Sequence, residues 1–322
     1  MCKVSIVIPI YKVEAYLPEC LESIRRQTVE DIEVLMVDDG SPDESADICR
    51  SFSERDTRFR LIQQENGGVT AARRTGVSLA TGEYVVFVDG DDTLPADSLE
   101  ILLNHMTDEV DMVVAQPDWN PMAVERRMVS VDEYRRMLIE GSLYLAMWAK
   151  LYRRHLFNDF TFAMPREIRA GEDWIANLRL AFNTEKNVLL VPDVVYHYRQ
   201  NEEGVSSTIR RTVHHEKMVF EGLCASVPAA LRGEYISLIC AAYAPICVRY
   251  TKQMISLSPE AESFIQEIRR GISSQLWSML RIQDRLFIAH TGRISRLVLK
   301  FLSKVNQKLH SIIARFRQKG GF

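Results

Sequence analysis

Apolar runs of four to six residues alternate with helical stripes at the start of the chain. Four such runs, at residues 4–8, 32–37, 59–62 and 84–88, have the length and character of buried strands. Apolar residues at helical spacing separate the first two runs: Tyr16, Leu17, Cys20, Leu21 and Ile24. Apolar strands that alternate with helices form parallel sheets that are covered on both faces. The sequence therefore predicts an α/β fold.

Local signals predict where three helices begin. The sequence SPDE at Ser41 has the form of a capping box with proline at the first helical position. The glycine pair at Gly67 precedes a helix expected over about residues 70–80, and its N–H groups would face phosphate oxygens. This loop matches neither GxGxxG nor GxxxxGK[ST], so by itself it is a weak signal. Asp92 or Thr93 is predicted to cap a further helix near the following proline.

Carboxylates follow the second and the fourth predicted strands. Asp38 and Asp39 follow one strand, and Asp89 and Asp91 follow the other. In parallel sheets, ligands bind beyond the carboxyl ends of the strands. Clustered carboxylates need a compensating cation, and Mg²⁺ or Mn²⁺ takes oxygen ligands from one or two carboxylates plus substrate phosphates. A divalent metal with a phosphorylated ligand is predicted beside Asp89 and Asp91, whereas a solvated turn explains Asp38 and Asp39 equally well.

Other polar residues have a structural interpretation beside a functional one. Arg73 lies in the helix after the glycine pair and is predicted to reach the same site. Glu172 and Asp173 open a helix expected over residues 172–182, where acidic side chains favour the helix dipole. His197 is more often a packed or surface histidine than a ligand of metal or phosphate.

The length of the chain and its changing pattern predict two parts. A chain of 322 residues exceeds the usual single hydrophobic core. Further strands are expected at residues 110–115 and 188–191, and helical periodicity dominates after about residue 207. The expected organisation is a domain over residues 1–210, with halves 1–110 and 111–210, and a helical region over residues 211–322.

Cysteine usage and the start of the chain favour a cytoplasmic protein. The six cysteines form no CxxC pair, which is typical of reduced, buried thiols. The first apolar run is too short for a signal peptide and has no small-residue cleavage site. Residues 235–248 are shorter than the roughly 18 to 20 apolar residues that span a bilayer. Because they contain Pro245, they are interpreted as a kinked, buried helix.

The end of the chain has a different charge from the rest. From Arg285 to Phe322 there are nine Lys or Arg residues and no Asp or Glu, although the whole chain has net charge −3. Between Ile294 and Phe316, apolar residues lie on one helical face with cations opposite, a pattern typical of a helix on an anionic membrane. The alternative is a helix packed on its own domain or in a homodimer. Nucleic acid is disfavoured because the body is acidic.

Five sequence blocks, in order, closely resemble the family 2 glycosyltransferases over roughly residues 3–205: VSIVIPIYKVEAYLPECLESIRRQT, VLMVDDGSPDES, NGGVTAARRTGV, YVVFVDGDD and GEDWIANLRL. The resemblance implies the Rossmann-like GT-A fold with a helical extension after it. It also implies an inverting transfer of a sugar from a nucleotide-diphosphate donor, usually a uridine one, to an acceptor hydroxyl. The basic amphipathic end of the chain suggests that transfer takes place at the inner membrane face. We therefore expect the acceptor to be a saccharide or a lipid-linked precursor of a surface polysaccharide or glycolipid.

The same resemblance assigns roles to individual residues. On the donor side, Pro9 and Tyr11 would line the nucleotide pocket, with Asp38 and Asp39 at the uracil and Arg73 near base or phosphate. The DxD pair would place Asp89 towards the ribose and Asp91 on the metal, with His197 as a further candidate ligand. Asp173 would be the general base. The residues implied on the acceptor side are Trp148, Lys150 and Glu172. Lys12 and Arg74 stand where the family often has asparagine.

Two other functions compete with this one. An apolar strand followed by DxDxT, with Asp89 as nucleophile, is also the signature of haloacid-dehalogenase-like phosphatases. In those enzymes the motif normally lies on the first strand, whereas three strands precede it here. A non-catalytic scaffold at the membrane is the second alternative, against which the intact carboxylates argue.

Overall fold

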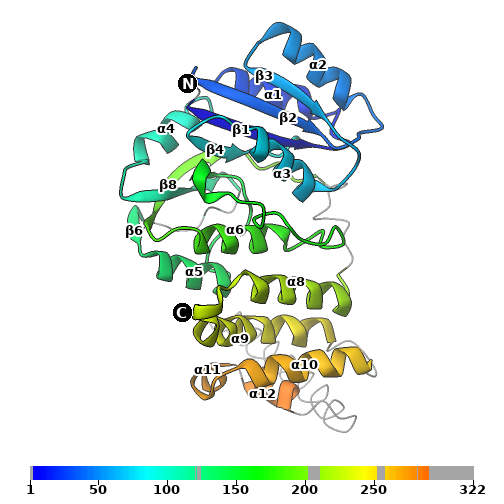
Figure 1. Cartoon of the computed structure of the whole chain (residues 1–322), viewed down its shortest axis with the longest axis vertical. Coiled ribbons are helices and arrows are strands. Elements are labelled where there is room, and N and C mark those ends of the chain that lie inside the picture. Colours follow the sequence, from blue (N-terminus) through cyan, green and yellow to red (C-terminus); the bar gives the residue numbers. More distant parts are fainter. Residues whose placement is uncertain are drawn as a thin grey trace, which may run out of the picture. The chain divides into compact units, whose positions relative to one another are not determined.

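The structure is a computed structural model of the whole chain, and it describes residues 3–119, 121, 125–201, 211–251, 258–280 and 282–289. The chain forms two compact units, Met1–Arg210 and Arg211–Phe322, and each is described by itself (Figure 1). The amphipathic helix expected between Ile294 and Phe316 lies outside the described residues.

The first unit is built on an eight-stranded sheet with the order β3-β2-β1-β4-β7-β5-β8-β6. Its first four strands are parallel and follow the predicted alternation: β1 Val4–Ile10, β2 Ile32–Asp38, β3 Phe59–Gln63 and β4 Tyr84–Phe87. Ile10 is level with Asp38, and Asp38 with Gln63, so these strands end at one edge of the sheet. The predicted α/β fold is confirmed.

The other half of the sheet is mixed. Its strands are β5 Val110–Pro117, β6 Arg127–Val129, β7 Lys150–Arg153 and β8 Asn187–Tyr196. β7 runs antiparallel between β4 and β5, and β6 pairs antiparallel with β8. The sequence pattern predicts β5 and β8 but misses β6 and β7. Segments of three and four residues are too short to carry a periodic signal.

Helices cover both faces of this sheet, as predicted (Figure 1). On one face, the helices α1 Leu17–Arg25, α2 Ser45–Arg55 and α4 Ser98–His105 share a hydrophobic core with Ile6 and Ile8. On the other, the helices α3 Val69–Leu79, α5 Val131–Glu140 and α6 Glu172–Phe182 share a core with Val7. Successive strand residues point to opposite faces, so β1 supplies both cores. Gly76 allows α3 to lie close to the sheet, because a Cβ there would overlap Val7.

Two predicted helix starts are wrong. α2 begins at Ser45, and the Ser41 hydroxyl instead accepts an N–H from the loop after β1 at 3.4 Å. α4 begins at Ser98, and neither Asp92 nor Thr93 caps it. In both cases, segments far away in the sequence supply the partners of these polar groups, which a local sequence signal cannot reveal.

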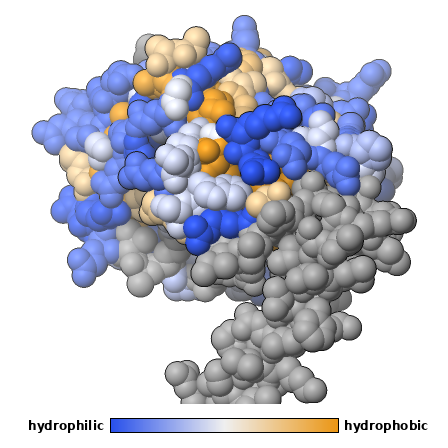
Figure 2. Space-filling view, turned by 90° about the horizontal axis from the view of Figure 1, so that it is seen from below, coloured by the Kyte–Doolittle hydropathy of each residue, from blue (hydrophilic) through white to orange (hydrophobic). Residues whose placement is uncertain are grey.

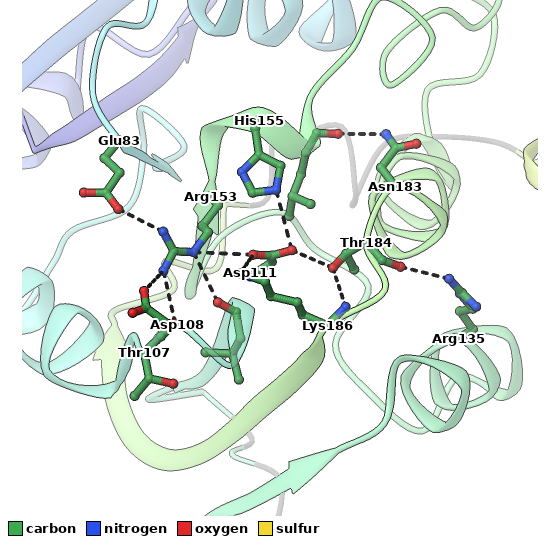
Figure 3. A network of polar contacts seen from close by, with 12 residues as sticks. Glu83, Thr107, Asp108, Asp111, Arg135, Arg153, His155, Asn183, Thr184 and Lys186 are labelled. Carbon is green, nitrogen blue, oxygen red and sulfur yellow. Dashed lines mark hydrogen bonds and ion pairs between the residues drawn. The ribbon is translucent and has the colours of Figure 1, made fainter.

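A buried carboxylate ties the start of β5 to neighbouring segments (Figure 3). Asp111 Oδ2 accepts the hydroxyl of Thr184 at 2.7 Å. Three side-chain nitrogens lie 3.4–3.6 Å from its oxygens, those of Arg153, His155 and Lys186. Arg153 is level with the first residue of β4, so this network lies at the sheet edge opposite to Asp89. It is a structural anchor, remote from the carboxylates at the other edge.

The second unit is helical, as expected. In its described residues, the α-helices are α8 Val213–Ser226, α9 Arg232–Thr251, α10 Pro259–Gly271, α11 Ser274–Met279 and α12 Ile282–Ala289. The rings of Phe220, Tyr243 and Phe264 pack edge to face with centroids 5.4–6.3 Å apart, which joins α8, α9 and α10. Gly271 allows close packing of α10 on α9, because a Cβ there would overlap the Cys240 Sγ.

One helical segment of the described residues, Ala229–Arg249, is long and apolar enough to cross a membrane by length and composition. Within it, Tyr235, Tyr243 and Cys247 are buried, and Pro245 lies inside the helix. Length and composition alone do not separate a membrane span from the core helix of a helical domain. Figure 2, the view from below, shows hydrophobic residues interspersed with hydrophilic ones on the described surface.

Candidate active site

The carboxylates after β2 are buried and fully engaged. Asp38 Oδ1 accepts the N–H of Ser41 at 3.0 Å, and its side chain is buried with that of Asp39. The Asp39 oxygens accept the N–H groups of Gly67 and Gly68 at 2.8 and 2.7 Å. The glycine N–H groups, which the sequence suggested for phosphate, therefore bind Asp39, and the carboxylate fixes the loop that enters α3.

The end of β1 lies beside this carboxylate. The N–H of Asp39 donates to the carbonyl of Ile10 at 2.9 Å, and Pro9 is the preceding residue of the strand. Tyr11 follows with 45% of its surface exposed. The Lys12 ammonium lies 5.3 Å from the centre of the Tyr11 ring. Pro9, Tyr11 and Asp39 are thus neighbours, as the family resemblance implies.

A buried arginine joins the two distant acidic motifs. Arg73, 3% exposed, places Nη1 at 2.5 Å from Asp173 Oδ1 and Nη2 at 3.0 Å from Asp89 Oδ1. Burial opposes its charge, but Asp173, Asp89 and Glu172 together raise the pKa of the guanidinium above its usual value. It remains a cation at every accessible pH. Asp89 and Asp173 are 84 positions apart in the sequence. Arg73 therefore joins the turn after β4 to the start of α6.

The turn after β4 is held by the end of β8. Asp92 is buried and accepts the Tyr196 hydroxyl and the Arg199 N–H, each at 2.7 Å. Burial, and then the nearby Asp89 charge, raise the pKa of Asp92 to about 8. The Tyr196 hydroxyl also accepts the N–H of Asp89 at 3.1 Å. Asn201 Nδ2 donates to Asp91 Oδ2 at 3.1 Å, so both ends of the turn are fixed.

His197 lies next to this turn. Its backbone pairs with Thr93, with N–O distances of 2.9 and 3.2 Å. Its Nδ1 lies 2.9 Å from Asp118 Oδ2. In the described residues, no three His, Cys, Asp or Glu side chains converge as a metal site. The donor set of Asp91 and His197 still fits a Mg²⁺ or Mn²⁺ ion that takes one or two protein ligands and completes its shell on substrate phosphates.

The start of α6 carries the other acidic pair. Asp173 Oδ2 accepts the N–H of Met147 at 3.3 Å, and its side chain is 21% exposed. Glu172 Oε2 is buried without a hydrogen-bond partner in the described part of the chain. Burial, and then the charge of Asp173, raise the pKa of Glu172 to about 7. One carboxylate is therefore held by Arg73, while burial shifts the pKa of its neighbour upwards.

The structure buries Trp148 and Lys150, two of the residues expected on the acceptor side. The Lys150 ammonium donates to the carbonyls of Tyr144 and Ala146, the former at 3.2 Å. Burial lowers the pKa of Lys150 to about 7. Lys150 thus holds the loop before β7 by its backbone carbonyls. Trp148, in contrast, belongs to a cluster of aromatic rings that reaches the surface.

The sequence reasoning missed the residues that hold the turn after β4. Tyr196, Arg199 and Asn201 lie beside His197 in the sequence, and only the histidine has a side chain that titrates near neutral pH. These residues hold the turn only because β8 ends beside it. In the sheet, β7 and β5 lie between β4 and β8, and the sequence pattern does not predict β7. The only available signal was the polar YHYRQN sequence directly after an apolar strand.

A Rossmann-like sheet with this acidic edge and a helix-borne carboxylate beside it defines a GT-A-type glycosyltransferase domain. The chain belongs to glycosyl transferase family 2, whose family model matches residues 5–167. EpsJ, an uncharacterized glycosyltransferase of Bacillus subtilis, is 34% identical over 216 residues, 63% of this chain and 62% of EpsJ. Glycosyltransferase GlyA of Streptococcus pneumoniae is 32% identical over 63% of this chain and 31% of GlyA.

Among solved structures, S. aureus TarS 1-349 in complex with UDP-GlcNAc has the same fold, with a TM-score of 0.74 at 18% identity. That match covers 92% of this chain and 89% of the TarS chain. The matched part of this chain spans less than two thirds of EpsJ and GlyA. Family membership favours the transferase over the phosphatase alternative.

Proposed function

We propose that the protein transfers a sugar, with inversion, from a uridine-diphosphate donor to an acceptor hydroxyl in the assembly of a surface polysaccharide or glycolipid. One observation carries this proposal: Arg73 brings the DxD carboxylate Asp89 and the helix carboxylate Asp173 to within one side chain of each other. Asp89, the proposed donor-binding group, and Asp173, the proposed base, therefore lie on either side of the same guanidinium. The UDP-GlcNAc in the TarS structure supports the choice of donor.

On the donor side, the nucleotide would lie at the carboxyl edge of β1 and β2. The exposed Tyr11 ring offers a stacking face for the base, and Asp39 forms the floor with its oxygens held by glycine N–H groups. Asp89 is 30% exposed and faces the same edge, where it would accept a ribose hydroxyl. Arg73, buried between the carboxylates, would orient Asp89 in the same way in every step.

Asp91 would hold a divalent metal, with His197 as a second ligand. When bound, Mg²⁺ or Mn²⁺ would offset the charge that develops on the departing diphosphate. This chain's own residues fix the turn that presents Asp91: the Asn201 amide holds one oxygen of that carboxylate, and Arg199 Nε donates to its carbonyl at 3.0 Å.

On the acceptor side, Asp173 would accept the proton of the attacking hydroxyl. Its Oδ1 is held by Arg73 and its Oδ2 by the Met147 N–H, so the carboxylate has a fixed orientation towards the site. Attack from the face opposite to the leaving diphosphate inverts the sugar without a covalent intermediate. A general base of this kind contributes roughly 10²- to 10⁴-fold to the rate.

The proposed division of labour follows the chain. Residues 1–110 would bind the donor, and residues 111–210 would bind the acceptor. The helical region of residues 211–322 would end in the basic amphipathic segment and bring the enzyme to the cytoplasmic membrane face. Loss of binding to anionic vesicles on deletion of residues 294–322 is the expected result for that last part, and unchanged binding would exclude it.

A thermal-shift panel tests the core of the proposal. UDP and GDP sugars are added to the full chain with Mn²⁺, Mg²⁺ or a chelator, for wild type, Asp91→Ala and Asp97→Ala. A ligand at about 100 times its Kd stabilises the folded state by about 2.7 kcal/mol. We expect metal-dependent stabilisation by a UDP sugar in wild type and in the exposed control Asp97→Ala, and its loss in Asp91→Ala. If no nucleotide stabilises the protein, the result would favour a non-catalytic scaffold over a transferase.

A further inference from the structure

Four aromatic rings form a continuous file that begins at the turn after β4 and ends at the surface. Trp148 stacks on Tyr196 with centroids 4.8 Å apart and planes inclined by 11°. Tyr198 follows at 5.8 Å from Trp148, and Trp119 at 5.4 Å from Tyr198. Tyr144 packs on the other edge of Trp148 at 5.9 Å. We call Tyr196, Trp148, Tyr198 and Trp119 the aromatic file.

The inner end of the file touches both catalytic motifs. The Tyr196 hydroxyl binds Asp92 and the N–H of Asp89, which fixes the DxD turn. Trp148 directly follows Met147, whose N–H donates to Asp173 at 3.3 Å. The file therefore starts where the proposed base and the proposed donor ligands meet, on the side of the sheet that residues 111–210 supply.

The outer end of the file is exposed and held rigidly. Trp119 is 45% exposed, and Tyr198 is partly exposed, whereas Trp148 and Tyr196 are buried. Asp118 Oδ1 accepts the N–H of Tyr198 at 3.0 Å, and the N–H of Asp118 donates to the Tyr196 carbonyl at 2.9 Å. A single exposed aromatic ring is ordinary on a protein surface. Here a fixed, partly exposed pair of rings continues a buried stack that reaches the proposed active site.

The chemistry of the file favours a sugar over a charged polymer. The C–H groups on one face of a pyranose ring carry partial positive charge and pack on the negative face of an aromatic ring. Asp118, 44% exposed, lies beside the outer rings. This carboxylate would repel the phosphates of an alditol-phosphate chain that lies along the outer rings.

We infer that Trp119 and Tyr198 form an acceptor subsite that stacks a pyranose ring beyond the sugar that receives the transfer. This inference rests on the proposed function and names its acceptor as an uncharged saccharide of at least two residues. Because Trp119 lies three rings away from the DxD turn, it acts on acceptor binding and not on the chemical step.

The test compares acceptors of different length and charge. Transfer from the UDP sugar found in the thermal-shift panel is measured with pyranose saccharides of one to four units, and with ribitol phosphate and glycerol phosphate oligomers. Wild type is compared with Trp119→Ala, Trp119→Phe and the control Met128→Ala, an exposed residue of β6. Saturation-transfer NMR with the same saccharides reports binding without turnover, and hydrolysis of the donor in the absence of acceptor reports the catalytic site alone.

In Trp119→Ala, we expect KM for saccharides of two or more units to rise about five- to tenfold, as the loss of one aromatic stacking contact implies. The kcat, the donor hydrolysis and the KM for a monosaccharide acceptor stay unchanged, and Trp119→Phe and Met128→Ala behave like wild type. An unchanged KM with intact donor hydrolysis would overturn the subsite but leave the proposed function standing. Preference for a phosphate oligomer, or no binding of any saccharide, would also overturn it. If wild type does not hydrolyse the UDP sugar at all, that result would instead count against the proposed function.

Discussion

The two halves of the first unit satisfy their polar groups in different ways. In residues 1–110, the carboxylates Asp38 and Asp39 bind backbone N–H groups of the same half, at Ser41, Gly67 and Gly68. In residues 111–210, Asp173, Tyr196 and Arg199 reach across to partners in the first half: Arg73, Asp92 and Asp91. Asp38 and Asp39 are thus held within the first half, whereas the turn with Asp89 and Asp91 and the proposed base Asp173 are held only where both halves meet.

The largest expected effect comes from removing the arginine that crosses this junction. Arg73→Ala leaves Asp89 and Asp173 without their buried counter-charge, and loss of one partner of a buried ion pair costs about 3–5 kcal/mol. We expect urea unfolding to show a loss of this size, together with loss of transfer. The neighbouring Arg74→Ala is the matched control, because Arg74 is exposed on the same helix and should change stability by less than about 0.5 kcal/mol. Equal stability of the two variants would mean that the junction does not depend on this ion pair.

The next effect concerns catalysis. Asp173→Asn keeps the shape of the side chain, but its single oxygen can accept only one of the two hydrogen bonds, from Arg73 or from the Met147 N–H, and the amide cannot accept a proton. We expect a roughly 10³-fold loss of kcat, within the usual range for a general base, while thermal stabilisation by the UDP sugar persists. Asp159→Asn, an exposed change in the same half, serves as the control. Transfer at the wild-type rate would remove Asp173 as the base.

The last effect is a change in pH dependence. The pKa of Asp92 is raised from 3.8 to about 8 in the folded protein, chiefly by burial. Between these values the folded state binds more protons than the unfolded state, so this residue makes the protein less stable as pH rises. We expect Asp92→Asn to lose that contribution: in urea unfolding with chelator, wild type should lose stability relative to the variant from about pH 4 to about pH 8. The exposed control Asp97→Asn should follow wild type. Parallel curves for wild type and Asp92→Asn would show that Asp92 is charged in the fold.

The sequence predicts residues 1–110 well, but it predicts poorly how residues 111–210 contact them. The four apolar runs mark β1 to β4, and the strand ends mark Asp39, Asp89 and Asp91, because these signals are local and periodic. The family motifs add Asp173, which its helix position alone would have explained by the dipole. The partners of Asp92 and the aromatic file depend on β8 lying near β4's end, and no local pattern encodes that neighbourhood. Lys150, which its motif position places on the acceptor side, is buried and donates to carbonyls of the loop before β7, which the motif does not reveal.

The antiparallel direction of β7 has a consequence for how such enzymes change. Because β7 starts at the edge where β4 ends, the loop over residues 141–149 is delivered to the catalytic side while the strand itself completes the sheet. Lengthening a surface loop by a few residues costs little entropy and leaves the strand register intact. A lineage can therefore exchange this loop, and with it the surroundings of Trp148, without disturbing the nucleotide side. Under the proposed function, a new acceptor preference can evolve by local change of this loop while the donor stays the same.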